Sequence, residues 1–190
     1  RRLGAVVSAL DVRAAAKEQV ESLGAKFITI SDDSDGETKG GYAKEMSEDY
    51  KTRQATLIKE ALRQADIVIT TALIPGKPAP RLISKDMLEE MRPGSIVLDM
   101  AVSQGGNCEG SQPDQVVEVG PVKIIGYSNL PGRLAQDTSQ LYAKNVLNFL
   151  HLCWDEQARI FDFSKSDEIL EATRIMDKGK FVHALFTKSA

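Results

Sequence analysis

Short runs of apolar residues recur along the first 130 residues, and longer segments that mix charged and apolar positions separate them. Each run is nearly continuous in its hydrophobicity rather than alternating, which is typical of strands buried on both faces of a parallel sheet. The expected strands are residues 5–10, 26–30, 66–70, 95–100 and 122–126. Because helical segments separate these strands, the pattern predicts an α/β fold built on a doubly wound parallel sheet.

The segments between the strands carry apolar residues at helical spacing, with recognisable start and stop signals. Gly24 ends the first helix, Ser84 is a suitable N-cap, and the last long helix begins at Thr138 or Ser139. The expected helices are 14–23, 47–65, 85–91 and 138–151. After the last helix the pattern weakens into short alternating pieces. We therefore expect one domain over residues 1–137, followed by a return helix and C-terminal segment over 138–190.

Three segments fit neither helix nor strand. Residues 31–41 are polar and glycine-bearing, and they exceed the usual βα loop of about 4 to 6 residues, which favours a mobile lid over a solvated linker. The run 75–80 contains three prolines and predicts a rigid connection. The pair Gly105–Gly106 predicts either a tight turn or a place where the backbone closely approaches a ligand.

Composition narrows the classes of partner. The chain has 24 basic and 27 acidic residues, a net charge of −3, and 42% hydrophobic residues, which indicates a folded core. There is no Lys/Arg-rich tract to bind nucleic acid, and no apolar run of the roughly 18 to 20 residues that a bilayer span needs. Two cysteines and two histidines at distant positions suggest neither a disulfide framework nor a metal site.

The beginning of the sequence resembles the end of a helix. Arg1 and Arg2 suit a helix C-terminus, and Gly4 is a suitable terminating residue. We therefore expect the chain to be a fragment whose first strand and most of whose first helix lie upstream, so that the sheet is incomplete at the N-terminus. A glycine-rich phosphate loop would lie in the same upstream segment.

Function is expected where the strands end, because ligands bind at the carboxyl edge of a doubly wound sheet. Asp11 follows the second strand of the expected sheet, where a carboxylate accepts hydrogen bonds from the ribose of NAD and repels the 2′-phosphate of NADP. Its alternative role is to cap the next helix, and without other information that role is the commoner one. The segment 71–80 is either a stiff surface turn or a backbone shelf for a ribose, and Asn129 is either a loop-stabilising residue or a ligand contact.

Several motifs together resemble one family. They are the segments 3–13, 17–24, 40–46, 70–80, 105–108 and 126–133. The chain is similar over residues 1–150 to the NAD(H)-binding domain I of proton-translocating NAD(P) transhydrogenase, the α subunit in bacteria. The resemblance implies a Rossmann-like fold and direct hydride transfer between NAD(H) and NADP(H), coupled to proton movement in a separate membrane domain.

The resemblance also implies which residues hold NAD(H). No catalytic side chain is expected, because the cofactor carries the chemistry and the protein supplies position. Tyr42 corresponds to the lid over the nicotinamide end, and Asp11 to the residue that holds the adenosine ribose. The implied contacts are Asp11, Val12, Arg13, Tyr42, Thr71, Ala72, Leu73, Val102, Asn129 and Leu130. The implied partners are an NADP-binding domain, a membrane domain and a second copy of the chain, at the cytoplasmic face of a bacterial inner membrane or the mitochondrial matrix face.

Two alternatives remain open. Alanine dehydrogenases resemble the chain around 101–106, but they carry a catalytic Asp where Ser103 stands here. A serine hydroxyl does not replace a carboxylate in proton transfer at neutral pH, which favours transhydrogenase. The other alternative is a non-catalytic remnant. In either case the fragment alone is expected to be inactive.

Overall fold

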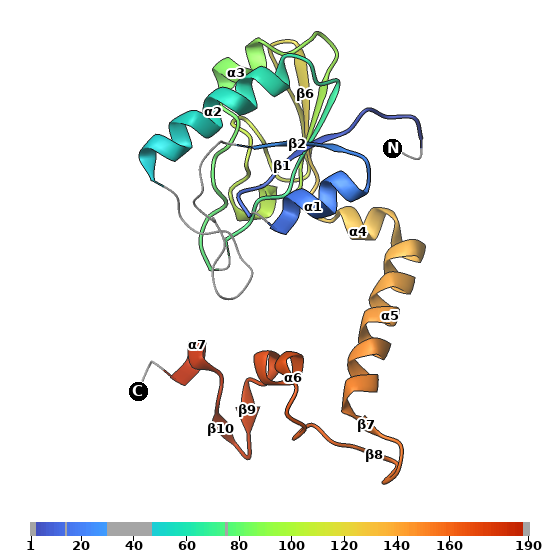
Figure 1. The fold of residues 1–190 in the computed structure, drawn as a ribbon. Helices are drawn as coiled ribbons and strands as arrows, with labels where there is room; N and C mark the ends of the chain where they lie inside the picture. Colours follow the sequence, from blue (N-terminus) through green and yellow to red (C-terminus); the bar gives the residue numbers. More distant parts are fainter. Residues whose placement is uncertain (1–2, 14, 30–46, 75, 188–190) are drawn as a thin grey trace. The chain divides into compact units, whose positions relative to one another are not determined.

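The computed structural model describes residues 3–13, 15–29, 47–74 and 76–187 (Figure 1). They form two compact units, Arg1–Leu130 and Pro131–Ala190. The architecture is mixed α/β. The boundary between compact units lies slightly before the division at 137/138 that the sequence suggested, and that division stays a prediction.

A βαβ unit opens the chain. Strand β1 (Ser8–Leu10) and strand β2 (Lys26–Ile28) pair in parallel, with Ala9 opposite Phe27. Helix α1 (Ala15–Ser22) connects them, and Gly24 turns the chain with a φ of 76°. The predicted strand–helix–strand order is confirmed here, although the paired part of the first strand is shorter than the apolar run 5–10.

A four-stranded sheet with the order β3-β4-β6-β5 forms the centre of the first unit. Strands β3 (Ile67–Thr70), β4 (Ile96–Asp99) and β6 (Val122–Gly126) run parallel. Strand β5 (Gln115–Val119) runs antiparallel to β6. The expectation of an all-parallel sheet was therefore wrong at this edge. Gly120, with a φ of 56°, turns the chain directly back, and a turn this short can join only antiparallel strands.

The sheet is also divided where the sequence predicted a continuous one. In the part of the chain that the structure describes, β1 pairs only with β2, and β3 pairs only with β4. The side chains of Ile67 and Ile69 on β3 are 67% and 59% exposed, although both are strongly apolar. Strand β3 thus has one unpaired edge and one uncovered face among the described residues.

The core of the first unit lies between the sheet and two helices, α2 (Glu48–Leu62) and α3 (Lys85–Glu89), which lie side by side (Figure 1). Its buried members are Leu62, Ile83, Met87, Leu88, Met91, Val97, Cys108, Val122 and Ile124. Helix α2 is capped by Ser47, whose hydroxyl oxygen accepts a hydrogen bond from the Tyr50 amide at 3.3 Å. Outside the core, Glu90 binds both Lys59 and Arg63 of α2, at 2.7 and 2.6 Å.

The second unit consists of a long helix and short elements that follow it. After α4 (Leu130–Arg133), helix α5 runs over Ala135–Cys153, beginning slightly earlier than predicted. Two small antiparallel pairs and two short helices follow: β7 (Trp154–Asp155), β8 (Ile160–Phe161), α6 (Glu168–Thr173), β9 (Met176–Asp177), β10 (Lys180–Phe181) and α7 (Ala184–Thr187).

Many apolar side chains of the second unit are exposed. They include Leu141, Tyr142, Val146 and Leu147 of α5, and Phe161, Phe163, Ile169, Ile175 and Phe181 after it. Among the described helices of the whole chain, none combines the length and the hydrophobicity that a membrane span requires. The exposed apolar residues are instead spread over short elements and one face of α5.

Candidate functional site

Asp11 follows the carboxyl end of β1, and its half-buried carboxylate is held by Arg13. Oδ1 accepts hydrogen bonds from the Arg13 amide at 2.9 Å and from Nε at 3.0 Å, while Oδ2 accepts from Nη2 at 2.8 Å. Burial raises the pKa of Asp11, but these bonds and the Arg13 charge outweigh it and hold the pKa below its ordinary value. The side chain is therefore an oriented anion at neutral pH, with further acceptor sites available.

The local role of Asp11 differs from the helix cap that was its alternative. The carboxylate bonds the amide two residues further on, which is an Asx turn leading toward α1. Such a turn fixes the carboxylate at the strand end without using all of its acceptor sites. Val12, between the two partners in sequence, is half-buried.

The segment that follows β3 is fixed by a side chain distant in sequence. Asn107 Oδ1 accepts a hydrogen bond from the Ala72 amide at 3.0 Å, and its Nδ2 donates to the Ala72 carbonyl at 2.9 Å and to the Pro80 carbonyl at 2.8 Å. Asn107 is fully buried, whereas Thr71 and Leu73 on either side of Ala72 are exposed. The segment is thus anchored on its buried side and exposed on the other.

A buried carboxylate holds the turn from which Asn107 projects. Asp99, at the carboxyl end of β4, accepts hydrogen bonds from the amides of Ala101 at 3.0 Å and Cys108 at 3.1 Å, and from the Thr70 hydroxyl at 3.3 Å. Gly106 has a φ of 78°, and a Cβ there would lie 2.7 Å from Asp99 Oδ2. The Gly105–Gly106 pair therefore forms a tight turn, and its close approach is to Asp99.

Asp99 and Asn107 were absent from the residues that the sequence suggested. A signal was present, because Asp99 ends a buried apolar run and Asn107 directly follows two glycines. Its meaning depends on partners that are far apart along the chain, such as Ala72 and Asn107. Strand ends were interpreted as ligand contacts alone, and the polar groups that support those ends were not considered.

The remaining predicted residues follow the other parallel strands. Val102 opens a 3₁₀ turn, η1 (Val102–Gln104), after β4, and only 4% of it is exposed. Asn129 is exposed and Leu130 half-buried, shortly after β6. Because β3, β4 and β6 are parallel neighbours, the segments with Ala72, Val102 and Asn129 leave the same edge of one sheet. Asp11 follows the separate β1–β2 pair, and Tyr42 lies outside the described residues.

Cys108 has no features of a nucleophile. It is fully buried, and burial, with the Asp99 charge nearby, raises its pKa to about 12. Within the described ranges, no group of three or more His, Cys, Asp or Glu side chains is arranged to hold a metal ion.

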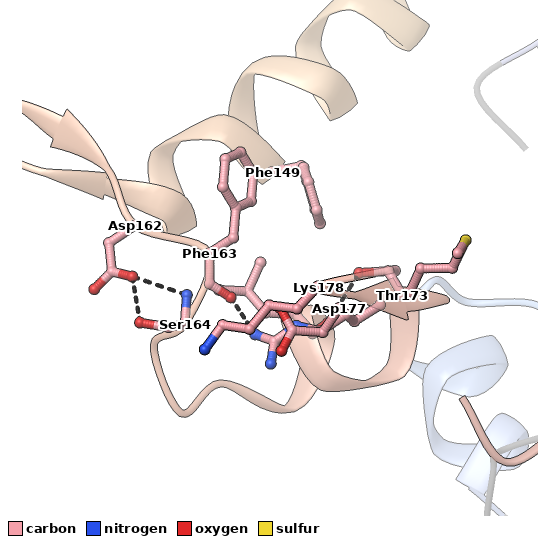
Figure 2. Close-up of a pocket in the computed structure, with 10 residues that line it drawn as sticks. Phe149, Asp162, Phe163, Ser164, Thr173, Asp177 and Lys178 are labelled. Carbon is pink, nitrogen blue, oxygen red and sulfur yellow. Dashed lines mark hydrogen bonds between the residues drawn. The ribbon is translucent and has the colours of Figure 1, made fainter. Parts of the chain in front are cut away.

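A hollow of about 510 Å³ lies in the second unit and is lined by none of these strand ends (Figure 2). Phe149 and Phe163 line it together with polar residues that bond to one another: Asp162 accepts from the Ser164 amide and hydroxyl at 2.8 and 2.6 Å, and Arg174 donates to the Phe163 carbonyl. None of the residues predicted to contact a ligand lines this hollow.

The chain resembles known proteins over nearly its whole length. Residues 1–184 match the family described as "Alanine dehydrogenase/PNT, C-terminal domain". An NAD(P) transhydrogenase subunit alpha protein of Rhodospirillum rubrum is 50% identical over 189 residues, covering 98% of this chain and 49% of the relative. The chain thus spans about half the length of this curated relative.

Solved structures agree with the sequence comparison. The crystal structure of transhydrogenase from Sinorhizobium meliloti superposes with a TM-score of 0.67 at 46% identity, covering 98% of this chain and 45% of that one. An L-alanine dehydrogenase structure gives a TM-score of 0.64 at 23% identity, covering 98% of this chain and 46% of its own, and supports the fold alone.

The environment of Cys108 predicts a slow thiol. With a pKa of about 12 against an ordinary 9.0, the thiolate fraction at pH 8 is about a thousandfold lower than that of a free cysteine. Iodoacetamide labelling of the native protein, followed by peptide mass mapping, should leave Cys108 unmodified. The same treatment in urea is the control and should label it fully. Rapid labelling of Cys108 in the native state would contradict the buried environment.

Proposed function

This chain belongs to the alanine dehydrogenase/PNT C-terminal domain family, and from that premise we propose that it is the NAD(H)-binding component of a proton-translocating transhydrogenase. The observation that carries the proposal is the oriented Asp11 carboxylate at the end of β1, together with the fixed segment after β3, which offers exposed backbone positions. The likeness to the Rhodospirillum rubrum subunit over 98% of the chain supports it.

The described residues fit a dinucleotide with vicinal ribose hydroxyls. The ionised Asp11 has acceptor sites for two hydroxyl donors, and the Arg13 guanidinium holds it in place. The same charge disfavours a 2′-phosphate, so the proposal includes selectivity for NAD(H) over NADP(H). Val12 and Arg13 complete this end, and Thr71, Ala72 and Leu73 form the backbone shelf for the ribose.

The nicotinamide end would lie along the edge that follows β4 and β6. Val102, Asn129 and Leu130 are the proposed contacts there. When bound, NAD(H) supplies the hydride, while the chain orients the ring and excludes water. At this edge Ser103 stands in place of the carboxylate that an alanine dehydrogenase would use, and Asp99 is fully buried with both oxygens bonded. This arrangement favours cofactor-to-cofactor transfer over oxidation of an amino acid.

The whole assembly is part of the proposal. We infer that the chain works beside an NADP-binding domain and a membrane domain, as a homodimer, at the cytoplasmic face of a bacterial inner membrane or the matrix face of a mitochondrial one. The relatives' names, which designate an NAD(P) transhydrogenase subunit, support this inference.

We also propose that a further strand lies between β1 and β3 and completes a Rossmann-like doubly wound sheet. Both strands have one paired neighbour among the described residues, and Ile67 and Ile69 of β3 expose apolar surface. Unpaired strand edges within a sheet are costly, because their amide and carbonyl groups need partners. The segment 138–190, with its exposed apolar residues, would likewise pack toward an upstream lobe.

The cofactor preference is tested at Asp11. Asp11→Ala should weaken NADH binding by about 1 to 3 kcal/mol, because a charge-assisted hydrogen bond is lost, and should reduce discrimination against NADPH. Calorimetric titration of both cofactors into the complete protein measures this. Glu18→Ala, on the exposed side of α1, is the matched control. Tighter binding of NADPH than of NADH by the unchanged protein would refute the proposed specificity.

The added strand is tested by comparing the 190-residue chain with the same chain preceded by the N-terminal half of the Rhodospirillum rubrum relative. We expect the short chain to unfold at a lower temperature and over a broader range, since two strand edges stay unpaired. Calorimetry of both proteins gives the midpoints and widths. A sharp transition for the short chain, together with NADH binding in the nanomolar to micromolar range, about −12 to −8 kcal/mol, would argue for a different strand order.

A further inference from the structure

We propose that Asn107, held in place by Asp99, is a positioning residue for the dinucleotide: it fixes the backbone that follows β3 in the shape that the cofactor needs. The inference rests on the proposed function. It adds two buried side chains that do not themselves touch the ligand, and it assigns the shape of the shelf to a bridge between segments distant in sequence.

The Asn107 side chain continues the sheet's hydrogen bonding beyond the end of β3. Strand pairing between β3 and β4 ends at Thr70 and Asp99, and the Met100 amide then donates to the Thr70 carbonyl at 2.9 Å. For Ala72, the Asn107 amide takes the place of a strand partner, binding both the N–H and the C=O of one residue. Two bonds to one residue fix its orientation as well as its position.

Asn107 also anchors the other end of the segment. Its Nδ2 donates to the Pro80 carbonyl at 2.8 Å, and its main-chain carbonyl accepts from the amides of Leu82 and Ile83 at 2.8 and 3.0 Å. One residue therefore holds the chain where the segment begins and where it ends. We call these contacts from Asn107 to Ala72 and Pro80 the Asn107 bridge.

Asp99 sets the position of the Asn107 bridge. Its carboxylate draws in the amides on both sides of the glycine turn, those of Ala101 and Cys108. In addition, the guanidinium of Arg81 donates to the Cys108 carbonyl at 2.6 Å. Asn107 thus projects from a turn that is bonded before and after it, which limits where its amide can lie.

The cost of burying these polar groups separates positioning from simple stability. A buried amide and a buried carboxylate cost desolvation energy, and an apolar side chain would fill the same space without that cost. What an apolar side chain lacks is direction, because only a group with a donor and an acceptor can align the Ala72 peptide. Thr71 and Leu73, the neighbours of that peptide, are the exposed positions proposed to meet the ribose.

The test uses Asn107→Asp, which keeps the shape but turns an oxygen toward the carbonyls of Ala72 and Pro80. In the complete protein, NADH fluorescence titration should give an affinity at least about tenfold weaker, while far-UV circular dichroism stays that of folded protein. Amide exchange should speed up in the peptide that contains Ala72. Val97→Ala, which opens a cavity in the core and leaves the Asn107 bridge intact, is the control: it should lower the unfolding midpoint without changing the affinity.

A milder variant covers the case in which Asn107→Asp does not fold. Thr70→Val removes the hydroxyl that donates to Asp99, keeps the side-chain shape, and should weaken NADH binding by about two- to fivefold. Unchanged affinity in folded Asn107→Asp, or in Thr70→Val if only that variant folds, overturns the inference while leaving the proposed function intact. Failure of the unchanged protein to bind NADH overturns the proposed function, and with it the role assigned to Asn107.

Discussion

The candidate site depends on one buried charge. The Asp99 carboxylate is fully buried at the end of β4, and the hydrogen bonds that reach it come from the Ala101 and Cys108 amides and the Thr70 hydroxyl. Burial of a carboxylate is costly unless its oxygens are bonded, so the surrounding backbone must turn its N–H groups inward. That requirement shapes the glycine turn, and the turn brings Asn107 against the segment after β3.

The two sheets of the first unit contribute to the site in different ways. The β1–β2 pair carries an acidic position whose charge is oriented locally, by Arg13 two residues away. The four-stranded sheet carries a backbone position whose geometry is set by residues far along the chain. The local arrangement keeps its form when neighbouring segments move, whereas the long-range arrangement requires the whole four-stranded sheet to be folded.

The elements that the sequence predicted well are those with short-range causes. The apolar runs at β3, β4 and β6 and the helical spacing of α2 appear as expected, because each is decided by the residues of the element itself. Strand β5 was missed, since its two adjacent valines interrupt the alternation that marks an edge strand. The support of the site by Asn107 could not be predicted in the same way, because its partners Ala72 and Pro80 come near it only in the folded sheet.

The double anchoring of the segment 72–80 also bears on how this stretch of the chain can vary in evolution. Because its two ends are tied to one side chain, the distance between them is constant, while the residues in between face fewer restrictions. Changes of residue type within the segment are therefore better tolerated than changes of its length. The prolines in its sequence act in the same direction, because they reduce the conformations that the unfolded segment can adopt. Insertions and deletions should accordingly be rarer here than in most surface connections of comparable exposure.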